Sequence, residues 1–242
     1  KIQVIHNGVR ESLFSDTHRR SEGDDEKFIL FSGRLVPMKN LPGVLRAFSL
    51  IKDKVPHNVV ITGHDRKQSP GAAVAVLHEY SIEPNRVEFK GHVSAGEMDE
   101  LLNRASLVVY PSFYEGFGLP PLEGMSHGCP VVVSNVASLP EVCGDAAEYV
   151  NPDDVNSIAE GMYRLLTDVG LRKHMITKGL IRARQFRWKK SALLHTVLFD
   201  AALHTQRTMR SARVGAWHSF GLAHAHSFLS LALSFISRLH IR

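Results

Sequence analysis

Cysteine is scarce in this sequence, and long apolar runs are missing. The two cysteines among 242 residues, Cys129 and Cys143, stand in apolar segments without the spacing of metal ligands. This pattern argues against a disulfide framework and a zinc site, and it favours reduced, buried thiols in a cytoplasmic protein. The apolar stretch at 228–236 is too short to span a membrane. A hydrophobic content of 44% still supports a core for one large domain or two small ones.

Acidic residues are absent after Asp200. Five arginines follow that position, so the formal net charge of +5 comes from the C-terminal end, while the first 200 residues carry 24 basic and 24 acidic side chains. A main body with balanced charge argues against a nucleic-acid partner. We expect residues 204–242 to form a basic tail of weak periodicity. This tail is a frayed helix, a non-native extension, or a helix that makes peripheral contact with the cytosolic face of a membrane.

An initiating methionine and a signal peptide are also missing. The chain opens at Lys1 in an apolar run, with Ile2, Val4 and Ile5, that looks like a strand already under way. We therefore expect further residues to precede Lys1 in the complete protein. Residues 15–27 are polar and turn-rich, which predicts a surface loop between this opening strand and the domain that follows.

From Phe28 to about Asp168, short apolar runs alternate with helical patterns. This alternation is typical of βαβ units around a parallel sheet. The runs are rich in β-branched and aromatic residues, which favours strands, and they lie at 28–32, 59–62, 87–89, 107–110, 130–134 and 148–150. The sequence thus predicts an α/β fold, a Rossmann-like parallel sheet with helices on both faces, over residues 28–203.

Helices are expected between these strands. Apolar residues at helical spacing follow Asn40, a good N-cap, and predict a helix over 41–51. Ser94 and Glu97 form a capping box ahead of another helical pattern. A third amphipathic stripe covers 155–166, and residues 170–203 indicate further helix with a break near 185–188.

Glycine and basic residues follow the predicted strands. In an open parallel sheet, ligands bind beyond the carboxyl ends of the strands. Gly33 and Arg34 follow the first predicted strand, Gly63 follows the second, and Lys39 stands just before a helix N-terminus. Arginine, lysine and the helix dipole together favour a diphosphate. The alternative is that the two basic residues are solvated loop cations.

Two glutamates, Glu115 and Glu123, flank a stretch with two glycines and two prolines. Pro120 and Pro121 suit the first turn of a helix, which predicts a start near Leu119 with Glu115 in the loop and Glu123 in the first turn. Gly116 and Gly118 leave backbone N–H groups open to an oxyanion or a sugar hydroxyl. The alternative is that Glu123 only complements the helix dipole and Glu115 is a solvated turn residue.

Together these segments resemble the retaining GT-B glycosyltransferases of family 4, also called group 1 glycosyltransferases. The resemblance covers about residues 3–200. It rests on "VIHNGV" (4–9), "FSGRLVPMKN" (31–40), "VEFKGHV" (87–93), "YPSFYEGFGLPPLEGMSHGCPVVVSN" (110–135) and "SLPEVCGDAAEYVNPDD" (138–154). Each motif alone is weak, whereas the set is specific.

The resemblance implies a role for each matching position. Arg34 and Lys39 would hold the nucleotide diphosphate, Glu123 the ribose, and Gly63 would let the phosphates approach the strand end. The donor sugar would contact Glu115 and the backbone of Gly116, Phe117, Gly118 and Leu119. The base would be lined by Lys90, Gly91, His92 and Val93. Arg34, Lys39 and Glu115 would be the catalytic residues.

The resemblance further implies a transferase that takes sugar from a UDP-, GDP- or ADP-linked donor with retention of configuration. The sequence has no Asp-x-Asp motif, so we expect no cofactor and no metal, with protein cations facing the diphosphate instead. Residues 1–14 would be the interdomain hinge, although Arg10 stands where the family usually has Asp. Residues 186–203 resemble the C-terminal helix that packs on the other half of such enzymes.

The N-terminal acceptor domain of the family is missing from this sequence. We therefore expect the chain to be the C-terminal donor-binding domain, inactive alone and cytoplasmic or peripheral at the membrane. The alternative is a non-catalytic nucleotide-binding or interaction module of the same fold.

Overall fold

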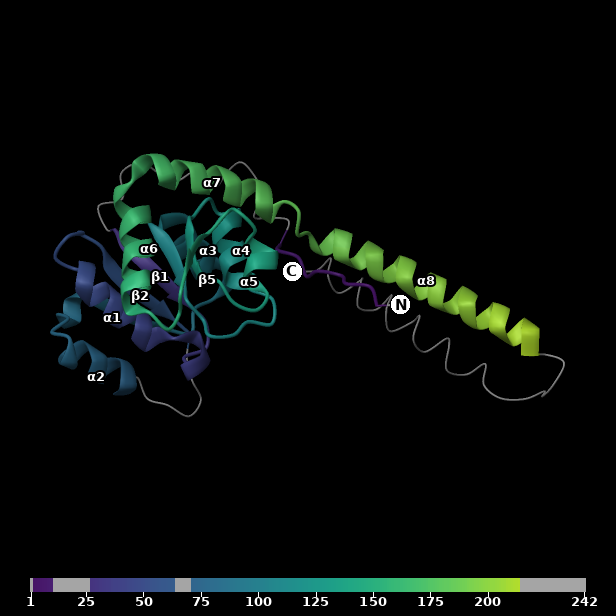
Figure 1. The fold of residues 1–242 in the computed structure, drawn as a ribbon, viewed down its shortest axis with the longest axis horizontal. Coiled ribbons are helices and arrows are strands. Elements are labelled where there is room, and N and C mark those ends of the chain that lie inside the picture. The colour runs from purple at the N-terminus through teal and green to yellow at the C-terminus, as the bar shows by residue number, and fades with distance from the viewer. Residues whose placement is uncertain (1, 11–26, 64–70, 214–242) are drawn as a thin grey trace. The chain divides into compact units, whose positions relative to one another are not determined.

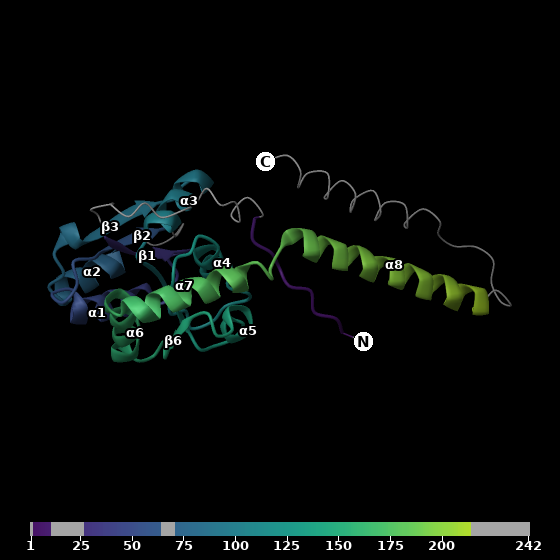
Figure 2. The ribbon, with the colours of Figure 1, turned by 90° about the horizontal axis from the view of Figure 1, so that it is seen from above.

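The computed structural model describes residues 2–10, 27–63 and 71–213. These residues fall into two units, which we describe separately (Figures 1 and 2). Asn7–Arg187 forms an α/β unit, and the residues up to His6 are grouped with the long helix α8 (Trp188–Arg213). The division falls at Trp188, whereas the sequence predicted one domain through residue 203.

A parallel sheet forms the centre of the α/β unit. Its strand order is β3-β2-β1-β4-β5-β6, and every pairing is parallel. All six predicted strands are present, at β1 (Phe28–Ser32), β2 (Asn58–Thr62), β3 (Val87–Gly91), β4 (Leu107–Tyr110), β5 (Val131–Ser134) and β6 (Glu148–Val150). Because β1 pairs with both β2 and β4, the strand order reverses between β1 and β4, which is where such sheets bind ligands.

Helices cover both faces of the sheet, as predicted. Alternate residues of β1 enter different cores: Ile29 and Phe31 pack with α1 (Leu41–Ile51), α2 (Gly71–Glu79) and α6 (Val155–Thr167). Phe28 and Leu30 pack on the opposite side with α3 (Ala95–Arg104), α4 (Leu119–Ser126), α5 (Leu139–Cys143) and α7 (Val169–Ala183). Figure 2 shows α3 on one side of β1–β3 and α1 on the other. Strands buried on both faces explain the uninterrupted apolar runs in the sequence.

The predicted helices are confirmed, and two further helices and two 3₁₀ turns are present. The capping box at α3 is complete, because Glu97 N–H donates to Ser94 Oγ at 3.3 Å and Ser94 N–H donates to Glu97 Oε2 at 2.7 Å. Helices α7 and α8 are separated at residues 184–187, close to the predicted break. Helices α2 and α5 were not predicted, and neither were the 3₁₀ turns η2 (Pro37–Lys39) and η3 (Pro84–Arg86).

The expected opening strand is wrong for the part that is described. Residues 2–8 contain no strand, and Val9 makes one isolated bridge, with Arg187, in which Val9 N–H donates to Phe186 O at 3.0 Å. A strand needs a neighbouring strand to pair its backbone N–H and C=O groups, and the six-stranded sheet does not extend to residues 2–8. The surface loop predicted at 15–27 lies, apart from Lys27, outside the described residues.

Both cysteines are buried and neither forms a disulfide, in agreement with the sequence. Burial raises the pKa of the Cys143 thiol to about 12. The predicted basic tail is described only in part: α8 continues to Arg213, and residues 214–242, including the apolar stretch 228–236, lie outside the described residues. Within the described part of the chain, none of the helices has the length and apolar character to cross a membrane.

Candidate functional site

A lysine, a tyrosine and a glutamate meet where the strand order reverses. Lys39 follows β1, Tyr110 is the last residue of β4, and Glu115 lies in the loop after it. Lys39 Nζ lies 2.5 Å from Glu115 Oε1 and 3.0 Å from the Tyr110 hydroxyl, and 5.1 Å from the centre of the Tyr110 ring. The Lys39 and Glu115 side chains are only 14% and 8% exposed. An ion pair so shielded from water is held in one geometry.

Tyr110 links both predicted glutamates. Burial raises its pKa well above the ordinary value, and the charges of Glu115 and Glu123 raise it further. Both carboxylates therefore lie close enough for their charges to act on the Tyr110 hydroxyl, Glu115 from the loop and Glu123 from α4. The hydroxyl stays protonated at physiological pH, so it can accept a hydrogen bond from Lys39 and donate one in turn.

Asn40 fixes the loop that carries Lys39. The sequence predicted this residue as an N-cap; it does occupy that position of α1, but its side chain makes no capping hydrogen bond. Asn40 Nδ2 instead donates to Pro111 O at 3.2 Å and to Pro152 O at 2.8 Å, and its φ of 58° is left-handed. A backbone bond from Phe113 N–H to Met38 O, 2.9 Å long, joins the same two loops. The loops after β1 and β4 are thus bonded together.

The loop after Glu115 is also held from outside. Ser138 Oγ bonds to the carbonyl oxygens of Glu115 and Phe117 at 3.0 and 2.9 Å. Gly118 precedes α4 with φ 105°, and a Cβ there would lie 2.8 Å from Leu139, whereas the space around the Gly116 Cα is open. Pro120 and Pro121 lie in the first turn of α4, as predicted. Since prolines have no N–H, Leu119 carries the N–H that the start of this helix offers a ligand.

Glu123 is the fifth residue of α4, so it lies in the second turn and the prediction of the first turn is wrong. Burial raises the pKa of Glu123 above the ordinary value of a glutamate, Arg10 opposes this rise, and Asp99 adds to it. Arg10 Nη2 lies 2.5 Å from Asp99 Oδ1, and His127 Nε2 lies 3.4 Å from the same oxygen. Arg10, the departure from the family pattern, is therefore part of the environment of Glu123.

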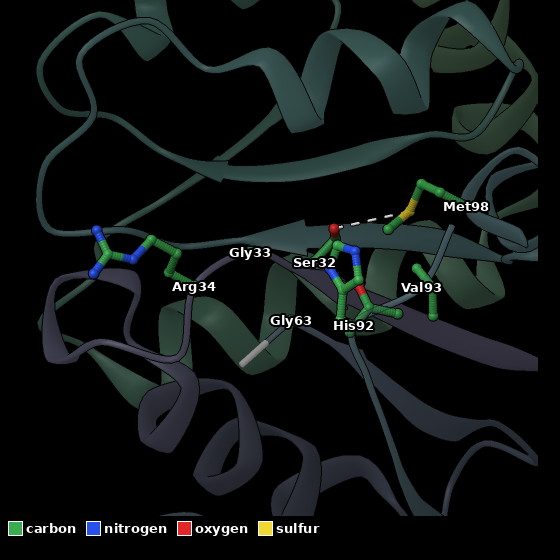
Figure 3. Close-up of a pocket in the computed structure, with 8 residues that line it drawn as sticks. Ser32, Gly33, Arg34, Gly63, His92, Val93 and Met98 are labelled. Carbon is green, nitrogen blue, oxygen red and sulfur yellow. Dashed lines mark hydrogen bonds between the residues drawn. The ribbon is translucent and has the colours of Figure 1, made fainter. Parts of the chain in front are cut away.

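A cleft of about 620 Å³ opens beside Tyr110, at the carboxyl ends of β1 and β2 and the first turns of α3 (Figure 3). Gly33 and Gly63 bring the strand ends close together, with φ of 147° and 108°. A Cβ on Gly63 would clash with the Gly33 carbonyl oxygen, and a Cβ on Gly33 would lie 3.7 Å from the Tyr110 hydroxyl. The cleft is lined by Ser32, Gly33, Arg34, Thr62, Gly63, His92, Val93 and Met98.

The predicted site residues therefore gather in two adjoining groups. Lys39, Glu115 and Glu123 surround Tyr110, and five predicted residues, Gly33, Arg34, Gly63, His92 and Val93, line the cleft. Arg34 is exposed, and its guanidinium has no partner among the described residues; Figure 3 shows it extending away from His92 and Met98.

Three predicted residues serve other contacts. Lys90 pairs with Glu88 at 2.6 Å and is not among the residues that line the cleft. Gly91, with φ 65°, accepts the Gly63 N–H at its carbonyl oxygen, 2.6 Å away. The Phe117 ring makes an edge contact with Phe186, with centroids 6.0 Å apart, and packs on the core beneath α3 and α4.

Some residues of this site were not predicted from the sequence. They are Tyr110, Asp99, Ser32, Thr62 and Met98, together with the loop-joining role of Asn40. A signal existed for Ser32 and Thr62, which end predicted strands directly before glycines. No group of three or more His, Cys, Asp or Glu side chains able to hold a metal ion is found among residues 2–10, 27–63 and 71–213.

Comparison with known proteins places this geometry in a family. The family model described as glycosyl transferases group 1 matches residues 15–181. The chain is 37% identical over 164 residues to the O-antigen chain mannosyltransferase B of Escherichia coli, covering 67% of this chain and 42% of that protein. The chain thus spans less than half the length of this relative.

Solved structures show the same fold. Sucrose-phosphate synthase from Thermosynechococcus elongatus matches with a TM-score of 0.72 and 26% identity over 84% of this chain and 53% of that one. Anabaena Alr3699/HepE, solved in complex with UDP-glucose, matches with a TM-score of 0.70 and 19% identity over 82% and 57%. The sheet and its helices correspond to one half of the GT-B fold, and the chain belongs to the group 1 glycosyltransferase family.

Proposed function

We propose that this chain binds a nucleotide-diphosphate sugar and forms the donor half of a glycosyltransferase that retains the configuration of the transferred sugar. The observation that carries the proposal is the contact of Lys39, Tyr110 and Glu115 beside the Gly33 cleft. It puts a cation and a carboxylate next to open backbone at the switch point of the sheet. The UDP-glucose complex of Anabaena HepE, a protein of the same fold, supports this class of ligand.

The ligand runs from the cleft to the Tyr110 cluster. The nucleoside occupies the cleft near His92 and Val93, and the ribose hydroxyls reach Glu123. The diphosphate lies over Gly33, where no side chain blocks it, between Arg34 and Lys39. The sugar then meets Glu115 and the backbone from Gly116 to Leu119. This order follows the carboxyl edge of the sheet from β2 and β3 toward β4.

Charge explains how this arrangement assists transfer. When the bond between the sugar and the diphosphate breaks, negative charge grows on the leaving phosphate and positive charge on the anomeric carbon. The Lys39 ammonium and the Arg34 guanidinium stabilise the first, and the nearby Glu115 carboxylate favours the second. We propose that these cations act without a metal, because the sequence has no Asp-x-Asp motif. For retention, the acceptor attacks on the face from which the diphosphate leaves.

We propose further that transfer requires an acceptor-binding half in addition to residues 1–242, because the chain covers 42% of the mannosyltransferase it matches and 53% of sucrose-phosphate synthase. The chain by itself binds the donor and transfers no sugar.

Calorimetric titration of the chain with UDP, GDP and ADP tests the binding step. We expect at least one of them to bind with a dissociation constant in the micromolar to millimolar range, and the Lys39→Ala variant to bind it at least about fivefold more weakly, which corresponds to about 1 kcal/mol or more. Lys178→Ala is the matched control. Lys178 lies on α7 and also forms an ion pair, with its Nζ 2.8 Å from Asp145 Oδ2. If a folded sample binds none of the three at millimolar concentration, the proposal is wrong.

A further inference from the structure

Two hydroxyl residues stand side by side at the floor of the cleft. Ser32 is the last residue of β1 and Thr62 the last of β2, and they are direct partners in the register of the parallel pair. Residues two apart on a strand share a face, so Ser32 lies on the side of Leu30, and Thr62 on the side of Val60. Leu30 and Val60 both belong to the core beneath α3. The two side chains therefore extend toward the same side of the sheet, about 4.8 Å apart at the backbone.

Neither hydroxyl has a nitrogen or oxygen partner among the described residues. Thr62 is 1% exposed, and its Oγ1 makes no hydrogen bond to any residue that the structure describes. A buried hydroxyl without a partner costs free energy, and native proteins rarely keep one. Among the described residues, the Ser32 hydroxyl bonds only to the Met98 thioether, at 3.8 Å (Figure 3). Sulfur is a weak acceptor, so a nitrogen or oxygen atom of a ligand competes for this proton easily.

The walls around the pair are apolar on one side. Val93 lies in the loop after β3, and Met98 lies on α3. Figure 3 shows both side chains near Ser32 and His92, with Arg34 at the other end of the cleft. None of the described residues that line the cleft carries a carboxylate. Apolar walls with a few convergent polar atoms are typical of sites for small organic ligands. The flat, hydrogen-bonding nucleoside suits this end, whereas a bare phosphate suits the end with the cations.

We propose that Ser32 and Thr62 form a hydroxyl pair that hydrogen-bonds the nucleoside part of the nucleotide. This inference rests on the proposed function and adds to it a specificity-determining element. Ser32 exchanges its thioether partner for the ligand, and Thr62 bonds to the ligand or to Ser32 in its new rotamer. Because a hydroxyl both donates and accepts, the pair can meet either kind of polar atom on the base or the ribose.

The test compares hydroxyl-free variants with variants that keep the group. Thr62→Val removes the hydroxyl with little change in shape, Thr62→Ser keeps it, and Ser32→Ala removes the other. Ser49→Ala is the control, since Ser49 Oγ bonds to Arg46 O on α1, away from the lining of the cleft. Each is titrated by calorimetry with the nucleoside diphosphate that the wild type binds, and separately with inorganic pyrophosphate. Melting temperatures show that each variant is folded.

We expect Thr62→Val and Ser32→Ala each to raise the dissociation constant for the nucleoside diphosphate about fivefold or more, while Thr62→Ser and Ser49→Ala leave it within twofold. Pyrophosphate binding should stay unchanged in all four variants. If folded Thr62→Val and Ser32→Ala bind the nucleotide as tightly as the wild type does, the proposal of a hydroxyl pair is overturned and the proposed function stays intact. Equal losses for pyrophosphate would also overturn it. A wild type that binds no nucleotide would refute both.

Discussion

Lys39 and Glu115 stand 76 positions apart in the sequence, yet their charged atoms lie 2.5 Å from each other. The contact depends on the switch point of the sheet, because one residue follows β1 and the other follows β4, and these strands are neighbours. The Asn40 bond to Pro111 and the Phe113 bond to Met38 tie the two loops together. The ion pair thus reports the same geometry that the proposed donor site requires.

Breaking this ion pair from one side should destabilise the fold more than replacing both partners. Glu115→Gln leaves the Lys39 ammonium nearly buried without a counter-charge, and we expect a loss of about 3–5 kcal/mol in the free energy of unfolding. Lys39→Met combined with Glu115→Gln should recover at least half of that loss. Urea unfolding of the two single variants and the double variant measures the coupling. If the loss in the double variant equals the sum of the losses in the two single variants, the side chains are not coupled and the contact does not stabilise the fold.

The two cations should differ in their response to salt. We expect Lys39→Ala to weaken nucleoside diphosphate binding by about 1–3 kcal/mol, at low and high ionic strength alike, because the side chain is shielded. Arg34 is exposed, so screening should shrink the effect of Arg34→Ala between about 0.05 and 0.5 M salt. Titrations at both concentrations check this contrast, and parallel salt dependence of the two variants would contradict it.

The sheet could be predicted because its strands are short β-branched runs buried on both faces. Helix α2 escaped prediction because its sequence, Gly71–Glu79, is rich in alanine and valine and shows little contrast between its faces. Helix α5 has five residues, too few for a periodic pattern to appear.

Site residues that lie at the carboxyl ends of strands could be predicted from the sequence. Contacts that depend on how the helices pack could not. Lys39 and Glu115 could be placed together, since the carboxyl ends of parallel strands share one edge. Tyr110 ends a predicted strand, so the same signal existed for it. The Arg10–Asp99 pair could not be predicted, because it depends on how α3 packs beside the segment that carries Arg10. The role of Lys90 beside the base stays a prediction, whereas its ion pair with Glu88 could have been foreseen, because residues two apart on β3 share a face.

Arg10 and Asp99 should shift the titration of Glu123 in opposite directions. The native pKa of Glu123 is raised, chiefly by burial. The native carboxyl therefore holds its proton to a higher pH than the unfolded chain does. The contribution of Glu123 to stability is fully present at a pH below its pKa in the unfolded chain, and it is lost as the pH rises through its pKa in the native protein. Arg10→Gln should raise this pKa further and Asp99→Asn should lower it.

Carbon-detected NMR of the glutamate carboxyl groups measures this pKa directly, and Glu123→Gln assigns the signal. If an ionised Glu123 binds the ribose, the pH at which nucleotide affinity falls by half on acidification should move up in Arg10→Gln and down in Asp99→Asn. Lys52→Gln is the control, since Lys52 also bonds to a carboxylate, 3.3 Å from Asp53, at another place on the surface. Shifts of the same sign in Arg10→Gln and Asp99→Asn would contradict this account of Glu123.

Asn40 allows the backbone and the side chain of one position to be tested separately. Asn40→Gly keeps the left-handed φ of 58° and removes the bonds to Pro111 and Pro152. We expect it to lose about 1–3 kcal/mol in the free energy of unfolding, because buried carbonyl groups lose a donor. Asn40→Ala loses the same bonds and adds about 1–2 kcal/mol for the unfavourable φ. Both variants should weaken nucleotide binding, since Lys39 is no longer held toward Glu115.

The order of the two variants decides between the explanations. If the side-chain bonds position Lys39, Asn40→Gly already weakens binding, and Asn40→Ala differs from it mainly in stability. If the left-handed turn alone positions the lysine, Asn40→Gly binds nucleotide like the wild type and only Asn40→Ala is impaired. Ser81→Ala is a matched control for the strain term, because Ser81 has φ 48° at an exposed turn outside the site. Urea unfolding and calorimetry on the three variants separate the cost of the turn from the loss of the bonds that join the loops after β1 and β4.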